Sequence, residues 1–239
     1  MNLLNSSNKK KIALLIDPDK PNQNFNKFIE DAKIFEIDFF FVGGSIVHNS
    51  VADIVNNIKE IAPNIPVILF PGNAKQFTNK ADGILYLSLI SGRNPDFLIG
   101  QHITNSVEII KSGIEVIPTG YILIDGGKET SVQKVSKTKP IPANDINLAV
   151  STAVAGELLG MQAIYLEAGS GAINSVPTEL ISEVKNNINK TLIVGGGIKT
   201  TKQISEIINA GADIIVVGNS LEDKPELLQS FVEIVHSFN

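Results

Sequence analysis

Three glycine-bearing segments in the last third of the chain have the composition of an anion-binding site. They are YLEAGSGA at 165–172, GGGIK at 195–199 and VGNS at 217–220. Glycine lets backbone amides approach a bound anion closely, and Ser170 adds a hydroxyl donor. Thr200 and Thr201 open a predicted helix after the second segment, and its N-terminus would add further amides. Each segment alone would indicate a tight turn, but three in succession predict a phosphate cradle.

Glu167 lies inside the first of these segments and is the candidate catalytic residue. A carboxylate beside a bound phosphate can accept the proton of a substrate hydroxyl and act as a general base. The alternative is a structural ion pair with a neighbouring lysine. Tyr165 precedes Glu167 by two residues, so both side chains point to the same side of a strand. Tyr165 therefore either hydrogen-bonds the substrate or belongs to the core.

A second group of polar residues follows two earlier apolar runs. Asp17, Pro18, Asp19 and Lys20 end the first run, and Gly43, Gly44 and Ser45 end the next. A carboxylate and a hydroxyl, completed by water and substrate phosphate oxygens, form a common Mg²⁺ site. The first segment alone is equally compatible with a β-turn and a helix cap. Taken together, the two segments lead us to interpret Asp17 and Ser45 as magnesium ligands.

These residues need a scaffold that brings strand ends together, and the apolar pattern predicts one. Eight short runs rich in Val, Ile, Leu and Phe are typical of buried parallel strands. We place them at Ile12–Ile16, Phe39–Val42, Val67–Phe70, Ile84–Leu87, Glu115–Pro118, Ala163–Glu167, Leu192–Val194 and Ile214–Val217. Helix-like segments with apolar residues at three- and four-residue spacing separate most of them, as at Val51–Ile61 and Ile204–Ile208.

Strands alternating with helices predict an α/β fold, and eight such units predict closure into a TIM-type (β/α)8 barrel. Barrels of this type carry their sites at the carboxyl ends of the strands, where all the polar segments above fall. The competing interpretation is an open, doubly wound sheet. Its usual fingerprint, GxGxxG after the first strand, is absent from this chain.

Two segments depart from the regular alternation. Pro71–Asp82, between the third and fourth strands, shows no amphipathic pattern. We therefore expect the barrel to lack the helix at this place. Gly120–Asn144, after the fifth strand, is long and polar and contains Gly126, Gly127, Pro140 and Pro142. A loop of that length inside a domain is either a lid or binding loop, or a disordered insertion.

Length and composition limit the functions that this barrel could have. The 239 residues fit a single barrel domain spanning 1–239. The net charge is −5, and no basic cluster indicates a nucleic-acid partner. The chain has no cysteine, which excludes disulfides and thiolate metal sites and fits a cytoplasmic location. No apolar run approaches the roughly 20 residues of a transmembrane segment.

Six segments, in order along the chain, resemble the geranylgeranylglyceryl phosphate synthase family, which includes the heptaprenylglyceryl phosphate synthases. They are IDPDK at 16–20, FVGGS at 41–45, LISGRNPDFLIGQH at 89–102, YLEAGSGA at 165–172, GGGIK at 195–199 and VVGN at 216–219. The fourth, together with SGRNP, is highly specific, whereas GGG or DPD alone is weak. Members of the family are TIM barrels that lack one helix, which agrees with the gap at Pro71–Asp82.

The resemblance implies a reaction and a set of site residues. A polyprenyl diphosphate would be joined through an ether bond to sn-glycerol 1-phosphate, with release of diphosphate. Asp17 and Ser45 match the family's Mg²⁺ positions. Positions matching the glycerol phosphate site are Tyr165, Leu166, Glu167, Ala168, Gly169, Ser170, Gly171, Gly195, Gly196, Gly218 and Asn219. Arg93, in SGRNP, either binds the diphosphate or is structural. We also expect a homo-oligomer, a dimer or larger, with transient membrane-surface contact for its lipid substrate or product.

One position departs from part of the family. Some bacterial members carry lysine two residues before the metal aspartate, where this chain has Leu15. The departure argues against a heptaprenyl donor, so we expect a geranylgeranyl tail. Two rival functions stay open. One is another phosphate-handling barrel of the isomerase or aldolase type, although no lysine lies inside strand six for a Schiff base. The other is a non-catalytic phosphate-binding barrel.

Overall fold

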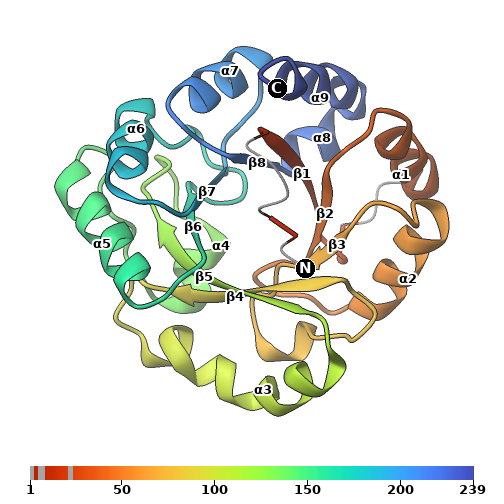
Figure 1. Ribbon diagram of the computed structural model, residues 1–239, viewed down its shortest axis with the longest axis horizontal. Coiled ribbons are helices and arrows are strands. Elements are labelled where there is room, and N and C mark those ends of the chain that lie inside the picture. The colour runs from red at the N-terminus through yellow and green to blue at the C-terminus, as the bar shows by residue number, and fades with distance from the viewer. Residues whose placement is uncertain (1–2, 5–8, 21–23) are drawn as a thin grey trace.

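Eight parallel strands close into a barrel, each pairing with its neighbours along the chain and the first with the last (Figure 1). The computed structural model describes residues 3–4, 9–20 and 24–239. The strands are β1 (Lys11–Ile16), β2 (Phe39–Val42), β3 (Val67–Leu69), β4 (Gly83–Leu89), β5 (Glu115–Leu123), β6 (Ala163–Glu167), β7 (Thr191–Gly195) and β8 (Ile214–Val217). The predicted TIM-type barrel is thus confirmed, and the open sheet is excluded.

Helices form a ring around the barrel (Figure 1). The α-helices are α1 (Phe25–Ile34), α2 (Val51–Ile61), α3 (Gln101–Ser112), α4 (Ser131–Ser136), α5 (Ile146–Leu158), α6 (Thr178–Asn187), α7 (Thr201–Asn209), α8 (Asn219–Asp223) and α9 (Leu228–His236). Short turns η1 (Ala74–Gln76), η2 (Asp96–Gly100) and η3 (Pro225–Leu227) complete the set. No helix in the described ranges is long and apolar enough to span a membrane.

Alternation along each strand divides the core into two parts. In β6, Tyr165 faces the barrel interior, whereas Ile164 and Leu166 pack against the helices. The interior is filled by aromatic and branched side chains, among them Phe39, Phe41, Ile68, Leu85 and Ile193. These side chains fill the barrel interior, so the space for a ligand lies near the carboxyl ends of the strands.

β5 extends five residues beyond its predicted end at Pro118. The stretch from Gly120 was interpreted as a loop, but both Pro118 and Gly120 pair with the neighbouring strands. Pro118 has no amide to donate, yet its carbonyl accepts the amide of Gln162 at 2.7 Å. Gly120 leaves room for Ile90 and Ile164, whose tips would lie 2.8 and 3.1 Å from a Cβ at that position. The prediction of a strand ending at Pro118 was therefore wrong.

The stretch 120–144 is mostly ordered structure, so its interpretation as a disordered insertion is wrong. Its first four residues belong to β5, and Ile124 forms a parallel bridge with Ile141. α4 follows, begun by a capping box in which Thr130 and Gln133 satisfy each other's backbone amides. The segment returns over the carboxyl ends of the strands, as a binding loop would.

The predicted missing helix is confirmed. Between β3 and β4 the chain forms only the single turn η1, and α3 approaches it from the next unit. Gln101 accepts the amide of Ala74 (3.1 Å), and Asn105 donates to the Ala74 carbonyl. These two α3 residues are four apart and therefore share one helix face. They fasten η1 in place without filling the space that an outer helix would occupy.

Candidate functional site

A cavity of about 1890 Å³, counted with its open side, lies at the carboxyl ends of the strands. We call it the mouth cavity. It is lined by ten of the fourteen predicted site residues, namely Asp17, Ser45, Tyr165, Glu167, Gly169, Ser170, Gly171, Gly196, Gly218 and Asn219. The fold thus brings the proposed metal side, on β1 and β2, opposite the proposed phosphate side, on β6 to β8.

The phosphate side is built from loops whose backbone only glycine adopts easily. Gly169 has φ +98° and Gly196 has φ +83°, both in the region that disfavours side chains. A Cβ on Gly196 would also collide with the Glu167 carboxylate and the amides of Ala168 and Gly169. Ser170 and Asn219 join the outer rim, since the Ser170 hydroxyl donates to Asn219 Oδ1 at 2.6 Å. Three separate loops thus form one concave surface.

The helix that presents its N-terminus to this surface is α8, and the expectation for Thr200 and Thr201 was wrong. α7 is capped by its own residues, because Thr200 Oγ accepts the Gln203 amide (3.2 Å) and Gln203 Oε1 accepts the Thr200 amide (3.1 Å). α8 instead begins directly at Gly218 and Asn219, which line the mouth cavity. A short extra helix after strand eight is a common phosphate site in these barrels.

Glu167 is a buried carboxylate at the floor of the mouth cavity, only 5% exposed. Its Oε1 accepts the amide of Gly169 at 2.6 Å. Burial raises the pKa of Glu167 from 4.5 to about 7, against the lowering effects of the Gly169 amide and the nearby Tyr165 hydroxyl. Among the described residues no lysine or arginine forms an ion pair with it, so the alternative of a structural ion pair is not supported. A carboxyl with a pKa near neutrality is suited to exchanging a proton.

The structure shows the core role of Tyr165, and the substrate-binding role stays a prediction. Its ring is fully buried and packs against Tyr121 and Phe70, with centroids 5.3 and 5.4 Å away. Its buried hydroxyl lies near enough to the Glu167 carboxylate to favour the charged form of that group, but it makes no hydrogen bond of good geometry with any described residue. Because a buried hydroxyl without a partner is costly, this group has a hydrogen bond to offer to a ligand beside Glu167.

Asp17 and Ser45 lie on adjacent loops of the mouth cavity. A Cβ on Gly44, the residue before Ser45, would be 3.4 Å from the Asp17 carboxylate, an ordinary contact distance that shows how close the two loops lie. Lys20 Nζ lies 3.4 Å from Asp17 Oδ2. No group of three or more metal-ligating side chains occurs in the described part of the chain. Two oxygen donors fit Mg²⁺, which usually keeps several waters and binds substrate phosphate oxygens.

A second cavity, of about 880 Å³ with its open side, continues from the mouth cavity toward α3. We call it the apolar groove. Its apolar lining comes from the segment after β3 that includes η1, from β4, from η2 and from α3: Phe70, Pro71, Ala74, Phe77, Ile84, Tyr86, Leu87, Leu89, Phe97 and Ile109. Gly44, Ser45, Phe70, Tyr121 and Val132 line both cavities. The groove exists because no helix covers β4 at this place.

Four predicted site residues do not line the mouth cavity. Leu166 and Ala168 are buried among the helices, so only their backbones could face a ligand. Gly195 lies behind the site, where a Cβ would be 3.2 Å from Glu167 Oε2. Arg93 donates through Nη1 to the carbonyls of Gly92 (2.7 Å) and Ile90 (3.4 Å), a structural arrangement within its own loop.

Three residues at the site were missed by the sequence reasoning. Tyr121 and Val132 lie at the junction of the two cavities, both inside the stretch interpreted as a loop. Asp19 accepts hydrogen bonds from backbone amides of the loop after β2. These contacts lower the pKa of Asp19, with the largest effect from the Asn49 amide and smaller ones from the His48 ring and amide. The alternation Tyr121, Leu123 along an extended β5 would have identified the first of them.

Comparison with known proteins agrees with this geometry. Residues 5–235 match the PcrB family. The geranylgeranylglyceryl phosphate synthase of Zunongwangia profunda is 49% identical over 218 residues, covering 90% of this chain and 92% of the relative. That of Spirosoma linguale is 45% identical over 235 residues, covering 98% and 94%. The (S)-3-O-geranylgeranylglyceryl phosphate synthase of Thermoplasma acidophilum, solved with its substrate sn-glycerol-1-phosphate, superposes with a TM-score of 0.90 at 33% identity, covering 96% and 94%.

Proposed function

The chain belongs to the PcrB family, and on that premise we propose how its two cavities divide the work of a prenyltransferase. The enzyme joins a polyprenyl diphosphate to sn-glycerol 1-phosphate through an ether bond and releases diphosphate. The observation that carries this proposal is the meeting of a polar mouth cavity and an apolar groove at Ser45 and Tyr121. A phosphate-binding barrel without a lipid substrate has no need for the second cavity.

The acceptor, sn-glycerol 1-phosphate, binds on the β6–β8 side. Its phosphate lies against the loops of Ser170, Gly196 and Asn219 and receives their backbone amides. This orientation directs the glycerol hydroxyls inward, toward Glu167 and the free Tyr165 hydroxyl. The same substrate occupies the structure of the Thermoplasma relative, which supports this assignment.

The donor binds with its diphosphate near Asp17 and its tail in the apolar groove. Along β4 the groove extends from Leu89 to Ile84, about 17 Å at roughly 3.3 Å per residue. Burial of a hydrocarbon tail there contributes about 25 cal/mol per Å² of apolar surface. We propose geranylgeranyl diphosphate as the donor, in agreement with the names of the relatives.

In the reaction the acceptor hydroxyl oxygen bonds to C1 of the prenyl group as the bond from C1 to the diphosphate oxygen breaks. The hydroxyl proton passes to Glu167 as the general base, and the electron pair of the broken bond leaves with the diphosphate. Tyr165 holds the attacking oxygen in line. Both substrates are fixed within one partly closed site, which removes much of the entropic barrier to their meeting.

Asp17 and Ser45 would hold Mg²⁺ between the protein and the donor. Mg²⁺ bound at these two residues would supply positive charge against the charge that develops on the diphosphate leaving group. Lys20 and Lys199, which also line the mouth cavity, bring positive charge to the same space. Arg93 keeps a structural role in this proposal.

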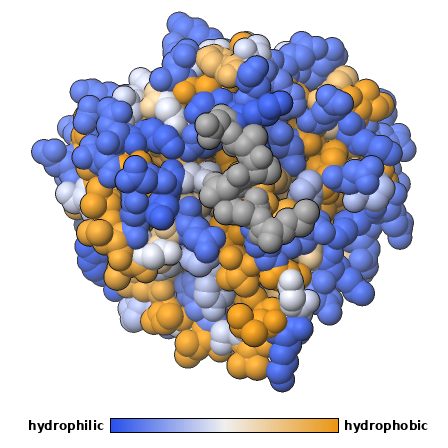
Figure 2. Space-filling model, in the orientation of Figure 1, coloured by the Kyte–Doolittle hydropathy of each residue, from blue (hydrophilic) through white to orange (hydrophobic). Residues whose placement is uncertain are grey.

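Homo-oligomer formation, transient membrane contact and a cytoplasmic location stay predictions. The surface available for such contacts includes α3 and η2, where Ile99, Ile103, Val107 and Ile110 are 60–76% exposed. Figure 2 shows hydrophobic surface along the lower edge of the view, where α3 lies. Sedimentation velocity and flotation with liposomes would measure the two kinds of contact separately.

The proposed function is tested by release of inorganic diphosphate from geranylgeranyl diphosphate. We expect release only when sn-glycerol 1-phosphate and Mg²⁺ are both present, and we expect EDTA to stop it. An isomerase, an aldolase or a non-catalytic barrel would release none. Release that does not depend on sn-glycerol 1-phosphate would contradict the proposed transfer.

A further inference from the structure

Asp19 connects the two loops that carry the proposed magnesium ligands. Its carboxylate accepts the amide of His48 through both oxygens (2.9 Å each) and the amide of Asn49 at 2.8 Å. The His48 ring adds a contact through Nδ1 at 2.7 Å. Asn49 Nδ2 returns a hydrogen bond to the Pro18 carbonyl at 3.0 Å. The loop after β1 is therefore tied to the loop after β2 by a group of contacts centred on one side chain.

The same residue also orients the first ligand. The backbone amide of Asp19 donates to Asp17 Oδ1 at 3.0 Å, which fixes the direction of that carboxylate. On the other loop, Ser45 lies between two anchored points. Gln76 accepts the Gly44 amide (3.3 Å) and donates to the Gly44 carbonyl (2.7 Å) before Ser45, while Asp19 holds His48 and Asn49 after it. Without the Asp19 carboxylate, the side of the Ser45 loop at His48 and Asn49 keeps only the hydrogen bond from Asn49 Nδ2 to the Pro18 carbonyl.

We propose that Asp19 is a positioning residue for the metal, holding Ser45 within reach of the cation that Asp17 binds. The inference rests on the proposed function, because that function supplies the magnesium. Its physical basis is that a site with only two protein ligands, on separate loops, depends on the spacing of those loops. Removing hydrogen-bonding partners behind metal ligands typically costs roughly 10–100-fold in metal affinity or activity.

The main test variant is Asp19→Asn. An amide side chain has one acceptor oxygen and one NH₂ group, so it cannot accept hydrogen bonds on both sides as the carboxylate does. His48→Ala is a milder variant, because it removes the ring contact and leaves both backbone amides. Asp38→Asn is the matched control. Asp38 accepts the Ile12 amide (2.9 Å) and contacts His236 Nε2 (3.1 Å), joining β1 to neighbouring elements at the opposite end of the barrel.

The first measurement is binding of Mn²⁺, as a spectroscopic replacement for Mg²⁺, by electron paramagnetic resonance in the presence of inorganic diphosphate. We expect Asp19→Asn to weaken Mn²⁺ binding about 10-fold or more. His48→Ala should have a smaller effect and Asp38→Asn none. In turnover assays, the Mg²⁺ concentration for half-maximal rate should rise for Asp19→Asn by a similar factor, with most of kcat recovered at saturating Mg²⁺.

Binding of sn-glycerol 1-phosphate, measured by calorimetry without metal, should be unchanged in all three variants and shows that each is folded. Unchanged Mn²⁺ affinity in Asp19→Asn, or a loss of kcat that saturating Mg²⁺ does not restore, would overturn the positioning role. If the wild type itself binds no Mn²⁺ and needs no Mg²⁺, the proposed metal site fails and the role of Asp19 with it. Asp17→Asn distinguishes the cases, because it should abolish binding wherever the site exists.

Discussion

At the residue scale, the account depends on Glu167 and on the cost of burying it. The barrel surrounds this carboxyl with apolar and aromatic side chains, and one amide partially compensates for the lost water. That environment raises its pKa into the range where a proton can be taken up and released near neutral pH. The burial that makes Glu167 suitable for proton transfer therefore also lowers the stability of the folded protein once the carboxyl is ionised.

The first prediction concerns turnover of Glu167→Gln. Glutamine keeps the shape and can still accept the Gly169 amide, but it cannot take a proton. We expect kcat to fall roughly 10²–10⁴-fold, the usual contribution of a general base. In the wild type, kcat/KM should rise with pH through about 7 and level off above it, because the base acts in its ionised form. A flat pH profile, or full activity of the variant, would remove Glu167 from the chemistry.

The second prediction concerns stability of the same variant. A folded-state pKa of about 7 against 4.5 means that the folded protein prefers the neutral acid. This contribution to stability is present below pH 4.5 and is lost as pH rises through 7, about 3 kcal/mol in all at about 1.4 kcal/mol per pKa unit. Glu167→Gln should therefore have a higher Tm than the wild type at pH 8 and a similar Tm at pH 5. Calorimetric scans at the two pH values measure the difference, and a lower Tm at pH 8 would argue against the raised pKa.

Individual site residues were predictable where they follow a strand directly. Asp17 directly follows β1, Ser45 comes shortly after β2, and Glu167 is the last residue of β6, so the barrel alone places all three near the mouth. Asp19 and Tyr121 were not predictable in the same way. The partners of Asp19 lie some 30 positions further along the chain, at His48 and Asn49. Tyr121 was missed because the stretch from Gly120 was interpreted as a polar loop, whereas β5 continues through it to Leu123.

At the element scale, the missing helix between β3 and β4 leaves the space that we propose for the lipid tail. An ordinary unit would cover the outer face of β4, including Ile84 and Tyr86, with a helix. Here η1 is held aside by Gln101 and Asn105, and the uncovered strand becomes the wall of the apolar groove. The sequence indicated the gap through its lack of amphipathic pattern, but not that the gap opens an apolar groove. The groove could not be recognised before α3 was placed, because residues of α3 form one of its walls.

The third prediction tests the groove with two substitutions on α3. Ile109 lines the groove and is 5% exposed, whereas Val107 points to solvent and is 66% exposed. Ile109→Phe should lower kcat/KM for geranylgeranyl diphosphate about 10-fold or more, because a ring occupies space needed by the tail, while shorter donors are less affected. Val107→Phe is the control and should leave kcat/KM unchanged for geranylgeranyl diphosphate and for the shorter donors. Kinetics on a series of prenyl diphosphates measures this, and equal losses for all donors would argue against a tail in the groove.

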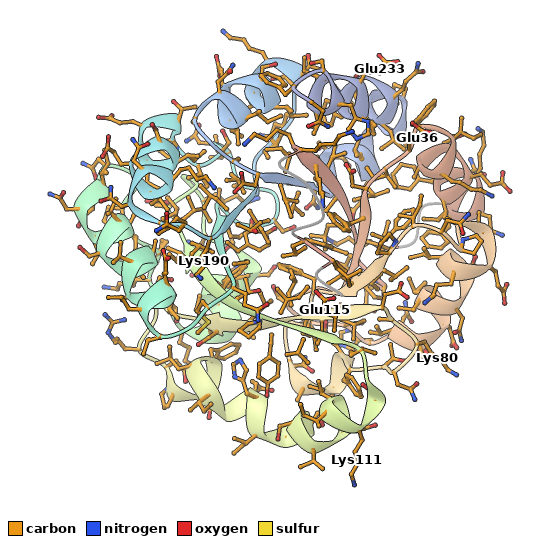
Figure 3. All side chains as sticks on the ribbon, viewed as in Figure 1. Glu36, Lys80, Lys111, Glu115, Lys190 and Glu233 are labelled. Carbon is orange, nitrogen blue, oxygen red and sulfur yellow. The ribbon has the colours of Figure 1, made fainter. Side chains whose placement is uncertain are left out.

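At the scale of the whole molecule, the two ends of the barrel have different roles. The mouth end carries the site, and the opposite end is sealed. Leu3 donates its amide to Glu115 Oε1 (2.8 Å), Leu4 joins the interior core, and buried Lys11 donates to the Leu4 carbonyl (3.0 Å). Figure 3 shows this opposite end, with Glu115 near the centre of the ring. Stability and function can therefore be changed separately.

The fourth prediction makes use of that separation. Leu4→Ala removes a core side chain at the sealed end, and we expect a loss of about 2 kcal/mol in the free energy of unfolding. Leu158→Ala is the control, because Leu158 is 82% exposed, and it should change stability by less than about 0.5 kcal/mol. Urea denaturation measures both, and kcat at 25 °C should match the wild type in each. A stability loss as small as that of the control would show that Leu4 does not seal the barrel.

The most direct test of the account follows the oxygen that forms the ether bond. We would supply sn-glycerol 1-phosphate labelled with ¹⁸O at the 3-hydroxyl, together with unlabelled geranylgeranyl diphosphate and Mg²⁺, and examine both products by mass spectrometry. The account predicts a geranylgeranylglyceryl phosphate that retains the label and a diphosphate that carries none, because the acceptor oxygen attacks carbon. Label in the diphosphate, or no ether product at all, would contradict it.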